Sequence, residues 1–235
     1  MPGKVNAFIF ARGGSKGLPR KNILPIAGHP LVAHSIKIAQ QISCIKDIFV
    51  STDCSEIGTI AQSYGAKVIW RPEELADDDA PEWLAWQHAI KNVYENYGEF
   101  DIFVSLPPTS PCRIVDDVLD CIKELENCND MVFAITESKR NPWFNMVKYE
   151  GSKVKLINSS QSITRRQDAP KCFDITTVAY AAKCSYIVQS NSIWDGSVGV
   201  TQVPEERAID IDSEFDFKIA KFLIESRSFD NLLTL

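Results

Sequence analysis

Residues 11–22 combine glycine and positive charge in a way that favours binding of a phosphate-bearing ligand. The segment follows a short apolar run, Val5 to Phe10, and has the sequence Ala-Arg-Gly-Gly-Ser-Lys-Gly-Leu-Pro-Arg-Lys-Asn. Its three glycines let backbone N–H groups approach an anion closely, and its four cations supply guanidinium and ammonium groups. The composition predicts a polyphosphate-binding loop. The simpler interpretation is a surface turn with solvated charges.

This loop differs from two common phosphate-binding motifs. The G-x-x-x-x-G-K-[ST] motif places a lysine and a hydroxyl residue at a helix start, whereas Gly17 precedes Leu18 and Pro19. The G-x-G-x-x-G spacing is also absent from the segment. The nucleotide class therefore has to be inferred from other features.

The second chemical feature is the pair Asp210 and Asp212. If residues 208–211 form a strand, both carboxylates point to the same side. Mg²⁺ commonly takes one or two carboxylates together with phosphate oxygens and water, so the spacing predicts a metal site. Two alternatives stay open: Asp212 could cap a helix that begins near residue 214, and the D-x-D pattern also fits a glycosyltransferase that holds a nucleotide sugar.

Charge is distributed unevenly along the 235 residues. The net charge is −6, yet the first 46 residues contain seven lysines and arginines and no acidic residue. A local positive field in an acidic chain favours a small anionic ligand and argues against a nucleic-acid surface. The apolar runs predict neither a membrane span nor a secretory signal. Seven cysteines without a C-x-x-C pair favour a reducing, cytoplasmic location.

Strand-like and helix-like segments alternate over most of the chain, which predicts an α/β fold with a parallel sheet covered by helices on both faces. Predicted strands cover residues 5–10, 47–51, 67–70, 101–106, 130–135, 173–182 and 208–211, and predicted helices cover about 30–42, 55–64, 81–97, 115–126 and 214–227. Ligands of such sheets bind beyond the carboxyl ends of the strands. We therefore expect residues 11–22, 51–53, 71–72 and 107–113 to meet in one crevice.

The alternation stops at residues 137–170, which are polar with scattered aromatic residues. We interpret this segment as an excursion from the main sheet, with short strands and a turn at Glu150-Gly151. Exposed strands need covering, so a contact between two copies of the chain is expected there. A mobile surface loop is the alternative.

Taken in order, these segments resemble the CMP-sialic acid synthetases, or acylneuraminate cytidylyltransferases. The run A-R-G-G-S-K-G-x-P-R-K-N looks like the signature of that family, and Arg71-Pro72, Pro108-Thr109-Ser110-Pro111, Arg166-Gln167 and Asp210-x-Asp212 follow in the same order. The resemblance implies a Rossmann-like nucleotidyltransferase fold, with a single domain over residues 1–235 and a dimerisation insertion at about 137–170. It further implies a homodimer that uses CTP and Mg²⁺ to convert a 2-keto-3-deoxy sugar acid into its CMP derivative and pyrophosphate.

The resemblance also implies roles for individual residues. The predicted CTP-binding residues are Ala11, Arg12, Gly13, Gly14, Ser15, Lys16, Lys21, Asn22 and Arg71, of which Arg12, Lys16 and Lys21 are predicted to be catalytic. The predicted sugar-binding residues are Pro107, Thr109, Ser110, Arg113, Arg166 and Gln167. Asp210 and Asp212 are the predicted metal ligands. A nucleotide-binding dimer without catalytic activity is a further alternative.

Three positions depart from the pattern of that family. Pro107 stands where glutamine is usual, Glu82 stands where a small hydroxyl residue is common, and residues 173–177 replace an Arg-x-Asn-Gly segment. We assign these changes to the sugar side, while the nucleotide loop is intact. This combination predicts CTP chemistry with an altered acceptor, such as legionaminic acid, a deaminated sialic acid or another keto-deoxy acid.

Overall fold

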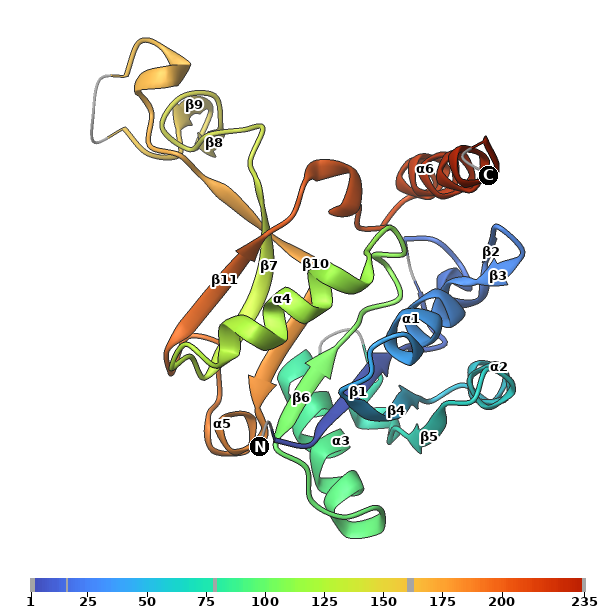
Figure 1. Cartoon of the computed structure of the whole chain (residues 1–235). Helices are drawn as coiled ribbons and strands as arrows, with labels where there is room; N and C mark the ends of the chain where they lie inside the picture. Colours follow the sequence, from blue (N-terminus) through green and yellow to red (C-terminus); the bar gives the residue numbers. More distant parts are fainter. Residues whose placement is uncertain (1–2, 16, 78–79, 160–162, 234–235) are drawn as a thin grey trace.

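A computed structural model of the chain describes residues 3–15, 17–77, 80–159 and 163–233, with side chains up to Ser226. Seven strands form the central sheet (Figure 1), in the order β11 (Val198–Gln202), β7 (Met131–Glu137), β10 (Phe173–Lys183), β6 (Ile102–Ser105), β1 (Val5–Phe10), β4 (Ile45–Thr52) and β5 (Lys67–Trp70). All neighbouring strands pair in parallel except β10, which is antiparallel to both β6 and β7. The predicted α/β fold with a mostly parallel sheet is confirmed.

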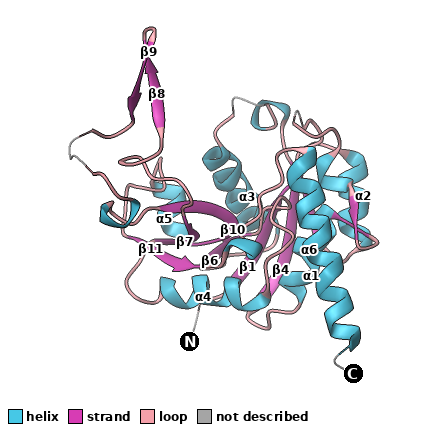
Figure 2. Cartoon of the chain, turned by 90° about the horizontal axis from the view of Figure 1, so that it is seen from above, coloured by secondary structure: helices cyan, strands magenta, loops and turns pink. Residues whose placement is uncertain are grey.

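Side chains alternate along the strands and divide the core into two layers. Helices lie on both sides of the sheet (Figure 2). On one face, Ala7 and Ile9 of β1 pack in a cluster with α1 (Leu31–Gln40), α2 (Ser55–Ser63) and α4 (Val115–Leu125). On the other face, Phe8 packs in a cluster with α3 (Glu82–Asn96) and α5 (Cys184–Gln189). The rings of Phe8 and Phe103 lie 4.7 Å apart in this second layer. The helices on both faces that the sequence predicted are therefore present.

A third, smaller cluster lies at the end of the sheet where the strands β1 and β6 finish. It joins the hairpin of β2 (Pro25–Ile26) and β3 (His29–Pro30) to α6 (Glu214–Leu233) through Ile26, Leu31, Cys112, Ile211 and Ala220. Single turns of 3₁₀ helix occur at Lys21–Ile23, Glu73–Leu75, Arg166–Asp168 and Glu205–Arg207. Among the described residues, no helix is both long and apolar enough to span a membrane.

Two element predictions were wrong in the last part of the chain. Residues 208–211 form no strand, and the seventh strand is β11 instead. Residues 208–211 and β11 are both short. Because Gly199 interrupts the apolar pattern of β11, the sequence pattern favoured a strand at residues 208–211 instead. In the last helix, Phe215 and Phe222 are exposed.

The excursion after β7 contains the predicted short strands. β8 (Val147–Glu150) and β9 (Lys153–Leu156) form an isolated antiparallel hairpin that extends from the rest of the chain (Figures 1 and 2). Gly151 has a φ of 64°, a left-handed conformation that glycine adopts without strain, so the turn falls where it was expected. The apolar residues Val147, Tyr149 and Val154 of this hairpin are exposed.

Candidate active site

A cavity of about 600 Å³ lies beyond the carboxyl ends of β1, β5 and β6. This volume is within the usual range for small-molecule sites. The residues that line it come from distant parts of the chain: Phe10, Arg12, Ser15, Gly17, Lys21, Asn22, Arg71, Leu75, Asp77, Ala80, Glu82, Ala85, Pro107, Pro108, Thr109, Thr177, Tyr180, Asp210 and Asp212. Three of the four segments expected in one crevice, the loops after β1, β5 and β6, line this cavity, whereas residues 51–53 after β4 are absent from its lining.

Residues 11–22, the glycine-rich loop, are held by hydrogen bonds to residues at and just after the end of β4. The N–H of buried Ala11 donates to the Ser51 carbonyl over 3.0 Å, and the Gly13 N–H donates to Asp53 Oδ1 over 2.8 Å. The Asn22 side chain donates to the Arg12 carbonyl over 2.9 Å. Gly13 and Gly14 are absent from the cavity lining, whereas Arg12 and Ser15 are part of it. Lys16 lies outside the described residues.

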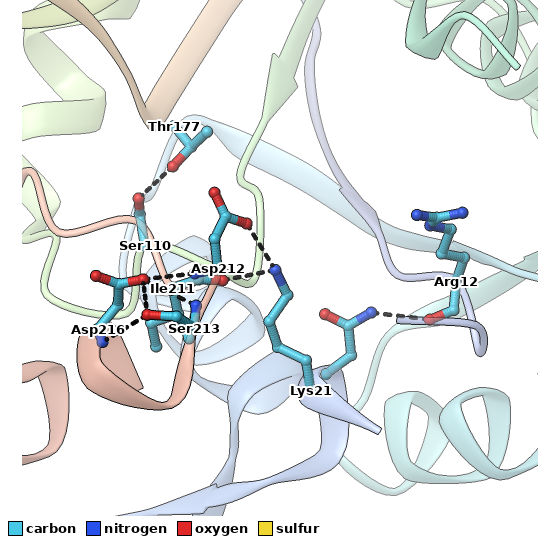
Figure 3. A network of polar contacts seen from close by, with 9 residues as sticks. Arg12, Lys21, Ser110, Thr177, Ile211, Asp212, Ser213 and Asp216 are labelled. Carbon is cyan, nitrogen blue, oxygen red and sulfur yellow. Dashed lines mark hydrogen bonds and ion pairs between the residues drawn. The ribbon is translucent and has the colours of Figure 1, made fainter. Parts of the chain in front are cut away.

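Lys21 connects the glycine-rich loop to residues 210–212, the aspartate segment (Figure 3). Its Nζ donates to the Ile211 carbonyl over 2.6 Å and lies 3.1 Å from Asp212 Oδ1. The Lys21 side chain is only 14% exposed. The two ends of the predicted site are thus brought into direct contact, although 190 residues separate Lys21 from Ile211 in the sequence.

Asp210 combines a partly buried carboxyl group with one oxygen, Oδ1, that has no hydrogen-bond partner among the described residues. Burial raises the pKa of Asp210, although the nearby hydroxyls of Thr109 and Thr177 act in the opposite direction. No group of three or more potential metal ligands of the His, Cys, Asp and Glu types occurs in the described parts of the chain. A carboxylate pair is nevertheless sufficient for Mg²⁺ when a nucleotide supplies phosphate oxygens.

The alternative role of Asp212 as a helix cap is not supported. Ser213 and Asp216 form the cap of α6 instead: the Ser213 N–H donates to Asp216 Oδ2 over 2.8 Å, and the Asp216 N–H donates to Ser213 Oγ over 3.3 Å. The Asp212 N–H also donates to Asp216 Oδ2 over 3.2 Å, while 77% of the Asp212 side chain is exposed. Asp216 therefore fixes the backbone of Asp212, and the Asp212 carboxylate is directed to Lys21 (Figure 3).

Arg71 and Glu82 line another part of the cavity wall. Arg71 donates from Nε and Nη2 to the hydroxyl and carbonyl of Ser51, and its guanidinium lies 5.5 Å from the centre of the Phe10 ring. Glu82 accepts a hydrogen bond from Trp86 Nε1 over 3.2 Å. Glu82 is exposed as a residue, yet surrounding protein atoms desolvate its carboxyl group and raise its pKa, an effect that Trp86 and Arg71 partly oppose.

The proline-rich turn places only some of its predicted residues in the cavity. Pro107 and Thr109 line it, whereas Ser110 is fully buried and hydrogen-bonded to the Thr177 hydroxyl at 2.6 Å. Arg113 is 2% exposed and donates to the carbonyls of Val178, Thr177 and Pro107 and to the Ser35 hydroxyl. Burial lowers the pKa of Arg113. Its predicted contact with the sugar is corrected, because its hydrogen bonds instead fasten the turn to β10 and α1.

Arg166 and Gln167 do not reach this cavity. They line a second one of about 390 Å³ at the base of the hairpin, together with Glu137, Ser138, Asn141, Ala169, Pro170, Lys171 and Cys172. Arg166 donates to the Lys139 carbonyl over 3.0 Å. Within one chain, these two predicted sugar-binding residues are therefore separate from the other predicted site residues.

Thr177 and Tyr180 of β10 line the main cavity and were missing from the predicted site. The pairing of β10 with β7 is irregular between Ile175 and Tyr180, which is where the strand faces the cavity. The sequence offered one signal, since residues 173–177 were noted as a departure from the family pattern. All three departures, at Glu82, Pro107 and residues 173–177, contribute residues to the lining of this cavity.

Comparisons with known proteins agree with this geometry. A model of the cytidylyltransferase family matches residues 7–193. The CMP-N,N'-diacetyllegionaminic acid synthase of Campylobacter jejuni is 35% identical, over 96% of this chain and 97% of that protein. The N-acylneuraminate cytidylyltransferase of Escherichia coli is 30% identical, over 92% of this chain and 51% of its own sequence. The solved structure of CMP:2-keto-3-deoxy-manno-octonic acid synthetase complexed with CTP has a TM-score of 0.72 and 16% identity, covering 95% of this chain and 99% of that one.

The fold and the match to these enzymes define a nucleotidyltransferase. More narrowly, the chain belongs to the cytidylyltransferase family, and the resemblance inferred from its motifs is confirmed.

Proposed function

We propose that the protein transfers CMP from CTP to an acidic 2-keto-3-deoxy sugar and releases pyrophosphate. The observation that supports this proposal most strongly is that one cavity is lined by the glycine-rich loop, through Arg12, Ser15 and Lys21, and by Asp210 and Asp212. A cationic loop and a carboxylate pair on the same cavity can hold a metal-bound nucleoside triphosphate between them.

In the proposed reaction, a hydroxyl of the sugar acid attacks the α-phosphorus of CTP and releases its proton to water. The new P–O bond forms as the bond between the α-phosphorus and the bridging oxygen of pyrophosphate breaks. Arg12, Lys16 and Lys21 neutralise the charge that develops on pyrophosphate, while backbone N–H groups of the loop, together with Asn22 and Arg71, orient the nucleotide. Such transfers need mainly positioning and electrostatic stabilisation from the protein.

Asp210 and Asp212 are the proposed ligands of Mg²⁺. The unpartnered Oδ1 of Asp210 and the exposed carboxylate of Asp212 fit a hard cation that also takes oxygen ligands from the nucleotide. When bound, the ion polarises phosphate oxygens and offsets their negative charge. In that state Lys21 has two anionic neighbours, Asp212 and the triphosphate.

The proposed acceptor is a nonulosonate, a nine-carbon sugar acid of the kind named in the relatives. Pro107, Thr109, Glu82, Thr177 and Tyr180 form the part of the lining available to it. Glu82 adds a hydrogen-bond acceptor, which suits an acceptor sugar with an additional N–H donor. This feature and the similarity to a diacetyllegionaminic acid synthase both favour a diamino nonulosonate.

The proposed assembly is a homodimer of single cytidylyltransferase domains, joined through the insertion at about 137–170. Exposed apolar residues on β8 and β9 support this proposal. Arg166 and Gln167, which lie away from the main cavity of their own chain, are then available to the site of the partner. The cytoplasmic location indicated by the cysteines completes the proposal, and all seven cysteines are free.

An acceptor panel tests the proposed function. The protein is incubated with CTP and Mg²⁺ and, in separate reactions, with diacetyllegionaminic, pseudaminic, sialic, deaminated sialic and keto-deoxy-octonic acids. We expect pyrophosphate release that requires CTP, Mg²⁺ and one of these acids. Binding of CTP without release for any acid would favour the nucleotide-binding dimer without catalytic activity. Transfer of a sugar from a nucleotide sugar would favour the glycosyltransferase.

A further inference from the structure

Gly17 of the glycine-rich loop lies directly against the backbone of Asp212. A Cβ placed on Gly17 would collide with the backbone carbonyl oxygen of Asp212 and lie 3.6 Å from its carbonyl carbon. A Cβ placed on Gly14, in the same loop, would meet nothing within 4 Å. The φ of Gly17 is outside the left-handed region, so glycine is needed there for space and not for its backbone conformation.

The Asp212 backbone cannot easily move away from such a side chain. The N–H of fully buried Ile211 donates to the Thr109 carbonyl over 2.9 Å, and Lys21 donates to the Ile211 carbonyl over 2.6 Å. On the other side, Asp216 accepts the N–H groups of Asp212 and Ser213. The segment is therefore fixed on three sides by the proline-rich turn, by Lys21 and by the first turn of α6.

We propose that Gly17 is a positioning residue that sets the distance between the triphosphate loop and the carboxylates of Asp210 and Asp212. This inference rests on the proposed function. Any side chain at position 17 forces the loop and the Asp212 carbonyl apart, because the contact leaves no room for a Cβ. Mg²⁺ requires near-ideal octahedral geometry with bonds of about 2.0–2.1 Å, so a displacement of this kind weakens a metal that is shared between nucleotide and protein.

The test compares metal affinity with nucleotide affinity in the Gly17→Ala variant. Mn²⁺, a spectroscopic substitute for Mg²⁺, is titrated by electron paramagnetic resonance in the presence of CTP and without sugar acid. CTP binding is measured separately by calorimetry in EDTA. We expect the Mn²⁺ midpoint to rise at least about tenfold in Gly17→Ala, in line with the losses that follow small misplacements in active sites, while CTP affinity in EDTA stays within about twofold of the parent.

Gly199→Ala serves as the matched control. It adds the same methyl group on the edge strand β11, away from the cavity, in a tight contact with Asn129. We expect it to lower the melting temperature without moving the Mn²⁺ midpoint. An unchanged midpoint in Gly17→Ala would overturn the inference. An equal loss of CTP binding in EDTA would overturn it as well, because it would indicate general damage to the loop. A parent protein that binds neither CTP nor Mn²⁺ would instead contradict the proposed function.

Discussion

Lys21 and Asp212 form the polar contact that joins the first and last parts of the site. Lys21 is mostly buried and donates to Ile211 as well as to Asp212, so its charge is held where a leaving pyrophosphate would develop negative charge in the proposed reaction. This placement gives Lys21 both a structural and a proposed catalytic role.

Replacing Lys21 with alanine should affect catalysis more than folding. We expect kcat/KM for CTP to fall about 10²–10³-fold, because a charged group that stabilises the transition state is removed. The lost contacts to Ile211 and Asp212 should lower the free energy of unfolding by about 1–2 kcal/mol. Lys46→Ala, which removes an exposed lysine of strand β4, is the control and should change neither quantity. Equal activity of Lys21→Ala and the parent would remove Lys21 from the catalytic residues.

Asp210 should show a conflict between stability and function. Its pKa is raised in the folded protein by burial, so ionisation of Asp210 opposes folding at pH values above the pKa of the unfolded chain, about 3.9. Asp210→Asn should therefore abolish Mg²⁺-dependent turnover and raise the melting temperature at pH 7. The gain should shrink as the pH falls toward 4 and vanish only well below the unfolded pKa of about 3.9, where both states bind the proton. A melting temperature at pH 7 below that of the parent would contradict this account of Asp210.

Individual site residues were predictable where the sequence placed them in a compact motif. Lys21 and Asn22 belong to one such motif, and Asp210 and Asp212 belong to another. All four residues line the cavity. Thr177 and Tyr180 were missed because they face the cavity from the middle of a long strand whose pairing is irregular there. Arg113 was misassigned because the sequence does not reveal that its guanidinium is buried against backbone carbonyls.

At the scale of elements, α6 has a capping arrangement that acts on the site as well as on the helix. Ser213 and Asp216 satisfy each other's N–H groups, and Asp216 also binds the N–H of Asp212. The first turn of α6 thus fixes the end of the aspartate segment. Cluster residues Ile211 and Ala220 complete the attachment of the helix to the hairpin β2–β3.

Ser213→Ala should lower the free energy of unfolding by about 1 kcal/mol, the usual effect of removing a helix cap. Asp212→Ala is the control, since Asp212 is not the cap and its exposed ion pair contributes less than about 1 kcal/mol. Chemical denaturation of both variants measures the difference. A larger loss of stability in Asp212→Ala than in Ser213→Ala would restore the capping interpretation of Asp212, because alanine cannot cap a helix.

Elements with strong periodicity were predictable, and short ones were not. Strand β1 has the predicted bounds, and α2 differs from its prediction by one residue, because each has a clear apolar pattern and a defined end. Strand β11 was missed because its five residues include a glycine and its partner β7 lies far away in the sequence. Pairing between distant strands, and not local propensity, decides such short elements.

At the scale of the whole molecule, the hairpin β8–β9 has two chemically different faces. The pairs Val147–Leu156 and Tyr149–Val154 form an apolar face, while Lys148, Glu150, Lys153 and Lys155 form the other. Tyr149 is 84% exposed, which is unusual for a large aromatic side chain unless a partner covers it. This face is our proposed dimer contact.

A pair of charge substitutions tests that contact. Size-exclusion chromatography with light scattering should give the parent twice the chain mass of 26.3 kDa. The double variant Tyr149→Glu and Val154→Glu should be monomeric, because buried carboxylates without partners disfavour association. Lys148→Glu, on the opposite face of the hairpin, should remain dimeric. A monomeric parent, or a double variant that stays dimeric, would contradict the proposed interface.

The central claim is that the amino-terminal loop and the carboxyl-terminal aspartates act together on one nucleotide. A double-mutant cycle on Lys21→Ala and Asp212→Asn measures this directly, with CTP affinity in the presence of Mg²⁺ determined by calorimetry. We predict that the two changes are coupled by about 1 kcal/mol or more, so that the double variant binds CTP more tightly than the product of the single effects implies. Independent effects that multiply, or unchanged affinity in either single variant, would contradict the shared site.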